Sequence, residues 1–67
     1  MTLPERMKES AKDAGLRSHD IAALLDVSAA AVRAWWSGRN APSVDMAVRY
    51  ADVCGKHRPW LIYGKWS

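Results

Sequence analysis

The chain has 67 residues and a net charge of +3. So short a chain buries only about 60% of the surface that it exposes when unfolded. Its length allows one domain and excludes a two-domain enzyme. Hydrophobic residues make up 49% and charged residues 25%, which is typical of a folded globular domain and excludes a disordered one. The positive charge suits a polyanionic partner, although many unrelated small domains are equally basic.

Five helices are predicted along the chain, and no strand pattern competes with them. The first covers residues 3–14 and ends at Gly15, because glycine readily adopts the left-handed conformation that closes many helices. Its apolar positions recur at helical spacing: Leu3, Met7, Ala11 and Ala14. The second helix begins near Ser18 and ends near Leu25. Its apolar face is expected to carry Ile21, Leu24 and Leu25.

The third helix follows the second across a very tight turn. Ser28 suits its N-cap, and Val32 and Trp35 are its inward residues. The apolar spacing over about 18–37 fits a helix-turn-helix, and a plain helical hairpin would show the same spacing. Both interpretations stay open at this point.

The fourth and fifth helices follow a loop at 37–42 that is dense in turn residues. Ser43 suits the N-cap of the fourth helix, which ends at Gly55. Its apolar positions at helical spacing are Val44, Ala47, Val48 and Ala51. A short fifth helix is predicted from Pro59 onward, because proline suits the first helical position and four large side chains follow it.

The most specific pattern is the run AGLRSHDIAALLDVSAAAVRAWWSGRNAPSVDMAVRYADVCG, followed by RPWLIYG. Its most specific residues are Ala22, Val27, Ser28, Trp35, Gly38, Pro42, Ser43, Trp60 and Leu61. In this order they resemble the Cro/CI family of repressors, whose usual run looks like GLSQEELAELLGVSRSTISRWERG, then a basic loop, PS and a further helix. The resemblance extends from about Leu3 to Gly64. It implies an all-α fold, a five-helix lambda-repressor-like DNA-binding domain over residues 1–67, with the helix-turn-helix at helices 2 and 3.

Several positions depart from the family pattern. Asp26 replaces the usual glycine of the turn, and aspartate tolerates a left-handed backbone at some cost in strain. Ser18 replaces glutamine, which puts one phosphate contact in doubt, and Trp36 occupies the usual glutamate position. Lys56 and Arg58 replace residues that are more often apolar, so the approach to the fifth helix is expected to be unusually basic.

The resemblance assigns DNA base readout to the start of the third helix and to the residues one turn later: Ser28, Ala29, Ala30, Arg33 and Ala34. Arg33 is the only long polar side chain among them, and a guanidinium can bond to a guanine edge with two hydrogen bonds. The alternative is that Arg33 only touches phosphate. Alanine side chains form no hydrogen bonds, so DNA shape is expected to supply more of the discrimination.

Contacts with the DNA backbone are expected on two sides of the third helix. The loop and the start of the fourth helix resemble the family's phosphate clamp, with Gly38, Arg39, Asn40 and Ser43. The start of the second helix forms the other side, with Arg17, Ser18 and His19. For these exposed side chains, plain solvated surface is the alternative.

Two of the four tryptophans, Trp35 and Trp60, match core positions of the family, whereas Trp36 and Trp66 have no obvious interior place. Exposed aromatic side chains indicate a partner. The tail at 58–67 is therefore interpreted as the contact of a weak two-fold homodimer, formed by Leu61, Ile62, Tyr63 and Trp66. The alternative is a flap that closes the domain's own core.

No catalytic residue, cofactor or metal site is predicted. Cys54 and His57 are two candidate ligands, too few for a structural zinc site, and a buried cysteine with a surface histidine is the simpler interpretation. Ser18, His19 and Asp20 are sequence neighbours and cannot converge as a catalytic triad. With a single cysteine, no apolar run of about 20 residues and no signal sequence, we expect a cytoplasmic protein without membrane or small-molecule partners.

The functional hypothesis is a phage or prophage repressor of the Cro type that binds double-stranded DNA as a homodimer on a palindromic operator. The short chain favours a Cro-like over a larger CI-like repressor. Antitoxin and activator roles could use the same domain. A rival from another class is a protein-interaction module that keeps the fold without binding DNA, favoured by the alanine-rich third helix, Asp26 and an exposed Trp36.

Overall fold

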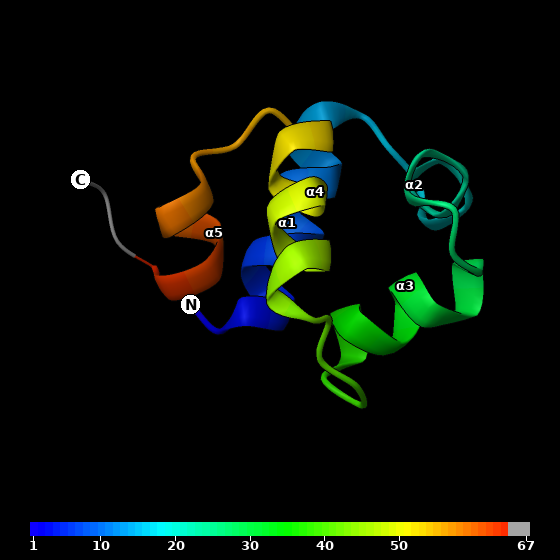
Figure 1. The fold of residues 1–67 in the computed structure, drawn as a ribbon, viewed down its shortest axis with the longest axis horizontal. Helices are drawn as coiled ribbons and strands as arrows, with labels where there is room; N and C mark the ends of the chain where they lie inside the picture. The colour runs from blue at the N-terminus through cyan, green and yellow to red at the C-terminus, as the bar shows by residue number, and fades with distance from the viewer. Residues whose placement is uncertain (65–67) are drawn as a thin grey trace.

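Five α-helices joined by short connections make up residues 1–64, the part of the chain that the computed structural model describes (Figure 1). Their bounds are α1 Leu3–Ala14, α2 Ser18–Leu25, α3 Ala29–Ser37, α4 Val44–Val53 and α5 Arg58–Tyr63. All five predicted helices are present, and the described residues contain no strand. The all-helical fold with α2 and α3 as its helix-turn-helix is therefore confirmed.

The helices begin at polar caps. The Ser28 hydroxyl accepts a hydrogen bond from the backbone N–H of Ala31 at 3.1 Å, and Ser43 accepts one from Met46 at 3.2 Å, so both predicted caps are confirmed. Sequence analysis missed the capping box at α1, in which Thr2 and Glu5 exchange hydrogen bonds between side chain and backbone. These caps satisfy N–H groups that have no acceptor inside the helix.

The core lies where α1, α2, α3 and α4 meet, and α5 closes it on one side (Figure 1). Its largest fully buried apolar side chains are Tyr50, Met7, Ile21, Leu25, Leu61 and Val32. Trp35, predicted to point inward, is 7% exposed and packs edge-on against the Tyr50 ring, with 6.3 Å between ring centroids. This core holds the outer face of α3 toward solvent.

Three residues predicted on inward faces are exposed instead. Leu24 is 57% exposed because α2 turns Ile21, Ala22 and Leu25 toward the core and leaves Leu24 beside that face. Val44, 62% exposed, occupies the first position of α4, and Ala14 the last position of α1, where the neighbouring helices do not cover them. Those three predictions were wrong.

Asp26 ends α2 in the left-handed conformation, with φ 58° and ψ 46°. The prediction that aspartate occupies this strained position is confirmed. Its N–H and that of Val27 donate to carbonyls of the last turn of α2, and Val27 reaches Ala22 at 3.0 Å. Ser28 then caps α3 immediately, which fixes the angle between the two helices.

Arg6 ties the two ends of the described chain together, a feature that sequence analysis missed. Its buried guanidinium donates hydrogen bonds to the backbone carbonyls of Leu61 at 2.8 Å and Ile62 at 3.2 Å, and to that of Met1. Carbonyls at a helix C-terminus carry partial negative charge, so they suit a buried cation that has no carboxylate partner among residues 1–64. Arg6 therefore anchors α5 against α1.

Candidate nucleic-acid interface

The outer face of α3 borders a groove of about 310 Å³ lined by Ala30, Arg33, Ala34, Ser37 and Arg39. Three residues predicted to read bases thus lie together with one predicted to bind phosphate. Buried Val32 and Trp35 hold the opposite face of α3 in the core, so its outer face is presented as a rigid surface. Arg33 is exposed and pairs with no carboxylate in the described part of the chain, which leaves its guanidinium available to a ligand.

The other two predicted base-reading residues lie at the start of α3 and are less available. The Ser28 oxygen accepts the capping hydrogen bond from Ala31, which leaves its hydroxyl hydrogen free to be donated. Ala29 is half-buried and packs against the core.

The predicted backbone contacts at the start of α2 sit beside a carboxylate. The Asp20 side chain accepts the N–H of Arg17 at 2.9 Å and lies 3.4 Å from the imidazole of His19. The Arg17 side chain is exposed without an ion pair in residues 1–64, whereas His19 already faces a negative charge. Ser18 is half-buried at the first position of α2. Arg17 is therefore the member of this set best placed for phosphate.

The backbone N–H groups of the loop after α3 form hydrogen bonds within the protein. Gly38 closes α3 with φ 79°, and the N–H groups of Arg39 and Asn40 both donate to the carbonyl of Ala34, at 3.0 and 3.4 Å. Ser43 caps α4. Backbone amides at 39 and 40 are thus occupied, so a phosphate contact from this loop depends on the exposed Arg39 and Asn40 side chains.

Trp36 is half-buried and hydrogen-bonded, so the prediction that it lacks a place in the domain was wrong. Its Nε1–H donates to the Tyr50 hydroxyl at 2.9 Å, and that hydroxyl donates to the Met7 carbonyl at 2.5 Å. Burial raises the pKa of the Tyr50 hydroxyl well above its usual range, so it stays a neutral donor. This relay connects α3 to α4 and α1, and spacing alone could not reveal it because Tyr50 lies fourteen residues away.

The basic side chains divide into paired and unpaired sets. Lys56 is 2.9 Å from Asp13, and Arg58 is 2.7 Å from Asp52. The hydrogen bonds from Arg58 lower the pKa of the Asp52 carboxyl. The expected basic approach to α5 is therefore neutralised by carboxylates. Six exposed basic side chains have no ion pair within residues 1–64: Lys8, Lys12, Arg17, Arg33, Arg39 and Arg49.

The predicted dimer residues have different surroundings. Leu61 is fully buried in the domain's own core, so its assignment to a dimer surface was wrong. Ile62 is half-buried, and Tyr63 is 66% exposed. Trp66 lies outside the described residues.

Cys54 is buried, as predicted, and burial raises the pKa of its thiol to about 11. His57 is exposed at the N-cap of α5. Residues 1–64 contain no group of three side chains suited to hold a metal ion. Within the same residues, no helix is long and apolar enough to cross a membrane.

A comparison with protein-family models matches residues 7–61 to a family described as helix-turn-helix, the Cro/CI type. A comparison with curated proteins finds no match. The matched region begins in α1 and ends in α5, so it includes the helix-turn-helix and the core that supports it. The chain belongs to the Cro/CI-type helix-turn-helix family and is a DNA-binding transcriptional regulator.

Proposed function

We propose that the protein is a Cro-type repressor that binds a palindromic operator as a homodimer and blocks transcription by occupying a promoter. The observation that carries this proposal is the outer face of α3, where Arg33, without an ion pair in the described part of the chain, shares a groove with Ala30, Ala34 and Arg39. A helix whose exposed face carries small side chains can fit closely into the major groove of DNA, which is wide enough for one α-helix.

In this mechanism Arg33 reads a guanine through two hydrogen bonds. Ala30 and Ala34 contact thymine methyl groups and add no hydrogen bonds of their own. Because one side chain supplies most of the direct readout, the shape and deformability of the DNA supply much of the remaining specificity.

Arg17 and Arg39 bind phosphates on either side of α3, with Asn40, Ser43, Ser18 and His19 as further candidates for backbone contact. Phosphate contacts fix the register without reading sequence and make the affinity depend on salt. Arg39 shares a groove with Arg33, so the two arginines offer a direct test of base readout against backbone contact.

The test compares Arg33→Ala and Arg39→Ala on a duplex selected from a random library and on a scrambled duplex of equal composition. Arg33→Ala is expected to cost about 1–3 kcal/mol on the selected duplex and little on the scrambled one. Arg39→Ala is expected to weaken binding to both. An equal loss on both duplexes for Arg33→Ala would assign Arg33 to phosphate and contradict this mechanism.

The homodimer is proposed to form through the C-terminal part of the chain, where Tyr63 is exposed and Ile62 is half-buried. One α3 touches only a few base pairs, so operator affinity requires two half-sites about 34 Å apart to be read together. So small a surface predicts dissociation in the micromolar range or weaker. Sedimentation of Tyr63→Ala and Trp66→Ala should show weaker self-association with the helical content kept. Unchanged association would place the interface elsewhere.

The rival, a protein-interaction module, loses one of its three supports because Trp36 is hydrogen-bonded within the domain. The alanine-rich face of α3 and Asp26 remain in its favour. A titration against DNA separates it from the repressor, because only a DNA reader prefers one sequence over another.

A further inference from the structure

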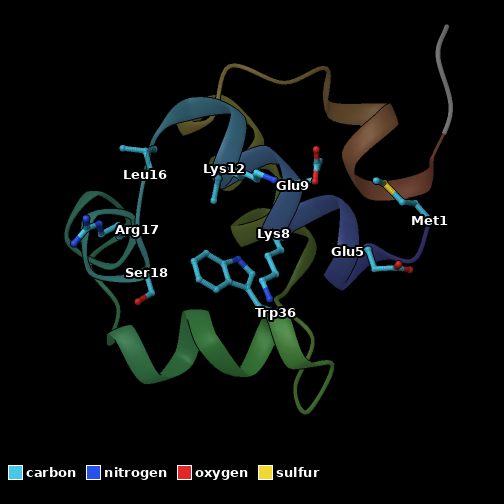
Figure 2. A pocket seen from close by; sticks show the side chains of 10 residues that line it. Met1, Glu5, Lys8, Glu9, Lys12, Leu16, Arg17, Ser18 and Trp36 are labelled. Carbon is cyan, nitrogen blue, oxygen red and sulfur yellow. The ribbon is translucent and has the colours of Figure 1, made fainter.

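A larger groove, of about 640 Å³, lies between α1 and α3 and reaches the start of α2 (Figure 2). The side chains that matter here are Lys8, Lys12, Leu16, Arg17, Ser18 and Trp36. Figure 2 shows the Trp36 ring on the floor of the groove, with Arg17 and Ser18 toward one end and Glu5 and Met1 toward the other.

Three exposed cations line the groove. Lys8, Lys12 and Arg17 are free of ion pairs among the described residues, and the Asp20 carboxylate beside Arg17 accepts the backbone N–H of Arg17 at 2.9 Å. The two acidic groups on the wall, Glu5 and Glu9, lie on the side toward Met1 in Figure 2, away from Arg17. This charge distribution suits an anion.

The floor of the groove is preformed. The hydrogen bond from Trp36 Nε1 to the Tyr50 hydroxyl holds the indole in place, and Tyr50 is itself fixed in the core. Leu16 adds a further apolar surface. A ligand with charged groups at its edge and less polar groups between them matches such a surface, and the phosphates and deoxyribose rings of a DNA strand alternate in this way.

We propose that this groove binds the phosphates of one DNA strand through Lys8 and Lys12, extending the protein–DNA contact beyond the helix-turn-helix onto α1. The proposal rests on the proposed function, because it requires duplex DNA to lie against α2 and α3. Two side chains already expected at the DNA backbone, Arg17 and Ser18, form part of the groove wall, so the surface is continuous with that interface. Lys8 and Lys12 stand one helical turn apart, about 6 Å along α1, and reach neighbouring phosphates.

The experiment measures binding to a fluorescent random-sequence duplex by anisotropy over a series of NaCl concentrations. Each phosphate contact contributes about 0.9 to the slope of log affinity against log salt. Lys8→Gln and Lys12→Gln should each make the slope shallower by about that amount, and the double variant by about twice as much. Arg49→Gln is the matched control, because Arg49 is an exposed cation on α4 that has no ion pair within residues 1–64 and does not line the groove. Its slope should stay unchanged.

Lysine variants with the slope of the unsubstituted protein would overturn the proposal while leaving the proposed function intact. An equal loss in Arg49→Gln would also overturn it, because the effect would then follow net charge rather than the groove. Failure of the unsubstituted protein to bind any duplex would contradict the proposed function itself, and this inference with it. A polyglutamate peptide provides the last comparison: lysine-dependent binding to it, with DNA slopes unchanged, would assign the groove to an acidic protein partner instead.

Discussion

Removing the hydroxyl of Tyr50 tests whether the relay between α3 and the core stabilises the domain. Tyr50→Phe keeps the ring and its edge-on contact with Trp35. It removes the acceptor of Trp36 Nε1 and one donor to the Met7 carbonyl. The substitution therefore isolates two hydrogen bonds without opening a large cavity.

The expected cost follows from what each partner loses. The Met7 carbonyl lies inside α1 and keeps its helical hydrogen bond, so its loss is modest. The Trp36 N–H is part-buried and loses its acceptor, and an unsatisfied buried donor costs about 1–3 kcal/mol. We expect a total loss of about 1–2 kcal/mol, against a stability of about 3–10 kcal/mol for a domain of this size.

Thermal unfolding followed by circular dichroism measures this cost. A loss of about 1–2 kcal/mol lowers the Tm of a domain this small by roughly 5–15 °C. Tyr63→Phe is the control, because the Tyr63 side chain is exposed and its hydroxyl should matter by less than about 0.5 kcal/mol. Equal Tm values for Tyr50→Phe and Tyr63→Phe would mean that the hydrogen bonds of the Tyr50 hydroxyl do not stabilise the domain. A double-mutant cycle with Trp36→Phe should also give a coupling free energy of about 0.5 kcal/mol or more.

Two further sets of substitutions test the left-handed backbone at Asp26 and the ion pair between Asp52 and Arg58. Asp26→Gly should stabilise the domain by about 0.5–1 kcal/mol in urea unfolding, because glycine adopts the left-handed conformation without the strain that aspartate has, whereas Asp26→Ala should destabilise it. Asp52→Asn should lower stability at neutral pH, since Arg58 lowers the pKa of this carboxyl in the folded state and favours its charged form. That difference should begin to shrink as the pH falls through about 4, the usual range of an aspartate, and should vanish only below the lowered pKa of the folded state, where Asp52 is protonated in both states. A difference that persists in stronger acid would contradict the ion-pair explanation.

The helices and the N-caps at Ser28 and Ser43 could be predicted because their signals are local, whereas the equally local capping box of Thr2 and Glu5 was overlooked. Ser28, Ser43 and Gly15 each determine the backbone within one turn, and the family resemblance supplied the order of the helices. The exposure of Leu24 could not be predicted in this way, because a short helix with several adjacent apolar residues can turn more than one face toward the core.

The parts of the site that sequence analysis missed depend on contacts between distant residues. Arg6 reaches carbonyls 55 and 56 positions away, and Trp36 reaches Tyr50 on another helix. Pairing of Lys56 with Asp13 likewise joins residues 43 positions apart and neutralises a charge that looked free in the sequence. Such contacts carry no local pattern, so only the packed fold reveals which cations remain available to DNA.

One ratio of affinities shows whether this domain reads DNA sequence through α3. Anisotropy titrations at a single salt concentration would compare a palindromic duplex selected by the protein with a scrambled duplex of equal length and composition. A domain that reads sequence through α3 is expected to prefer the selected duplex by about 10³-fold or more, and this preference should fall by about 10- to 100-fold in Arg33→Ala. A ratio near one for the unsubstituted protein, or a ratio that Arg33→Ala leaves unchanged, would contradict sequence readout through α3.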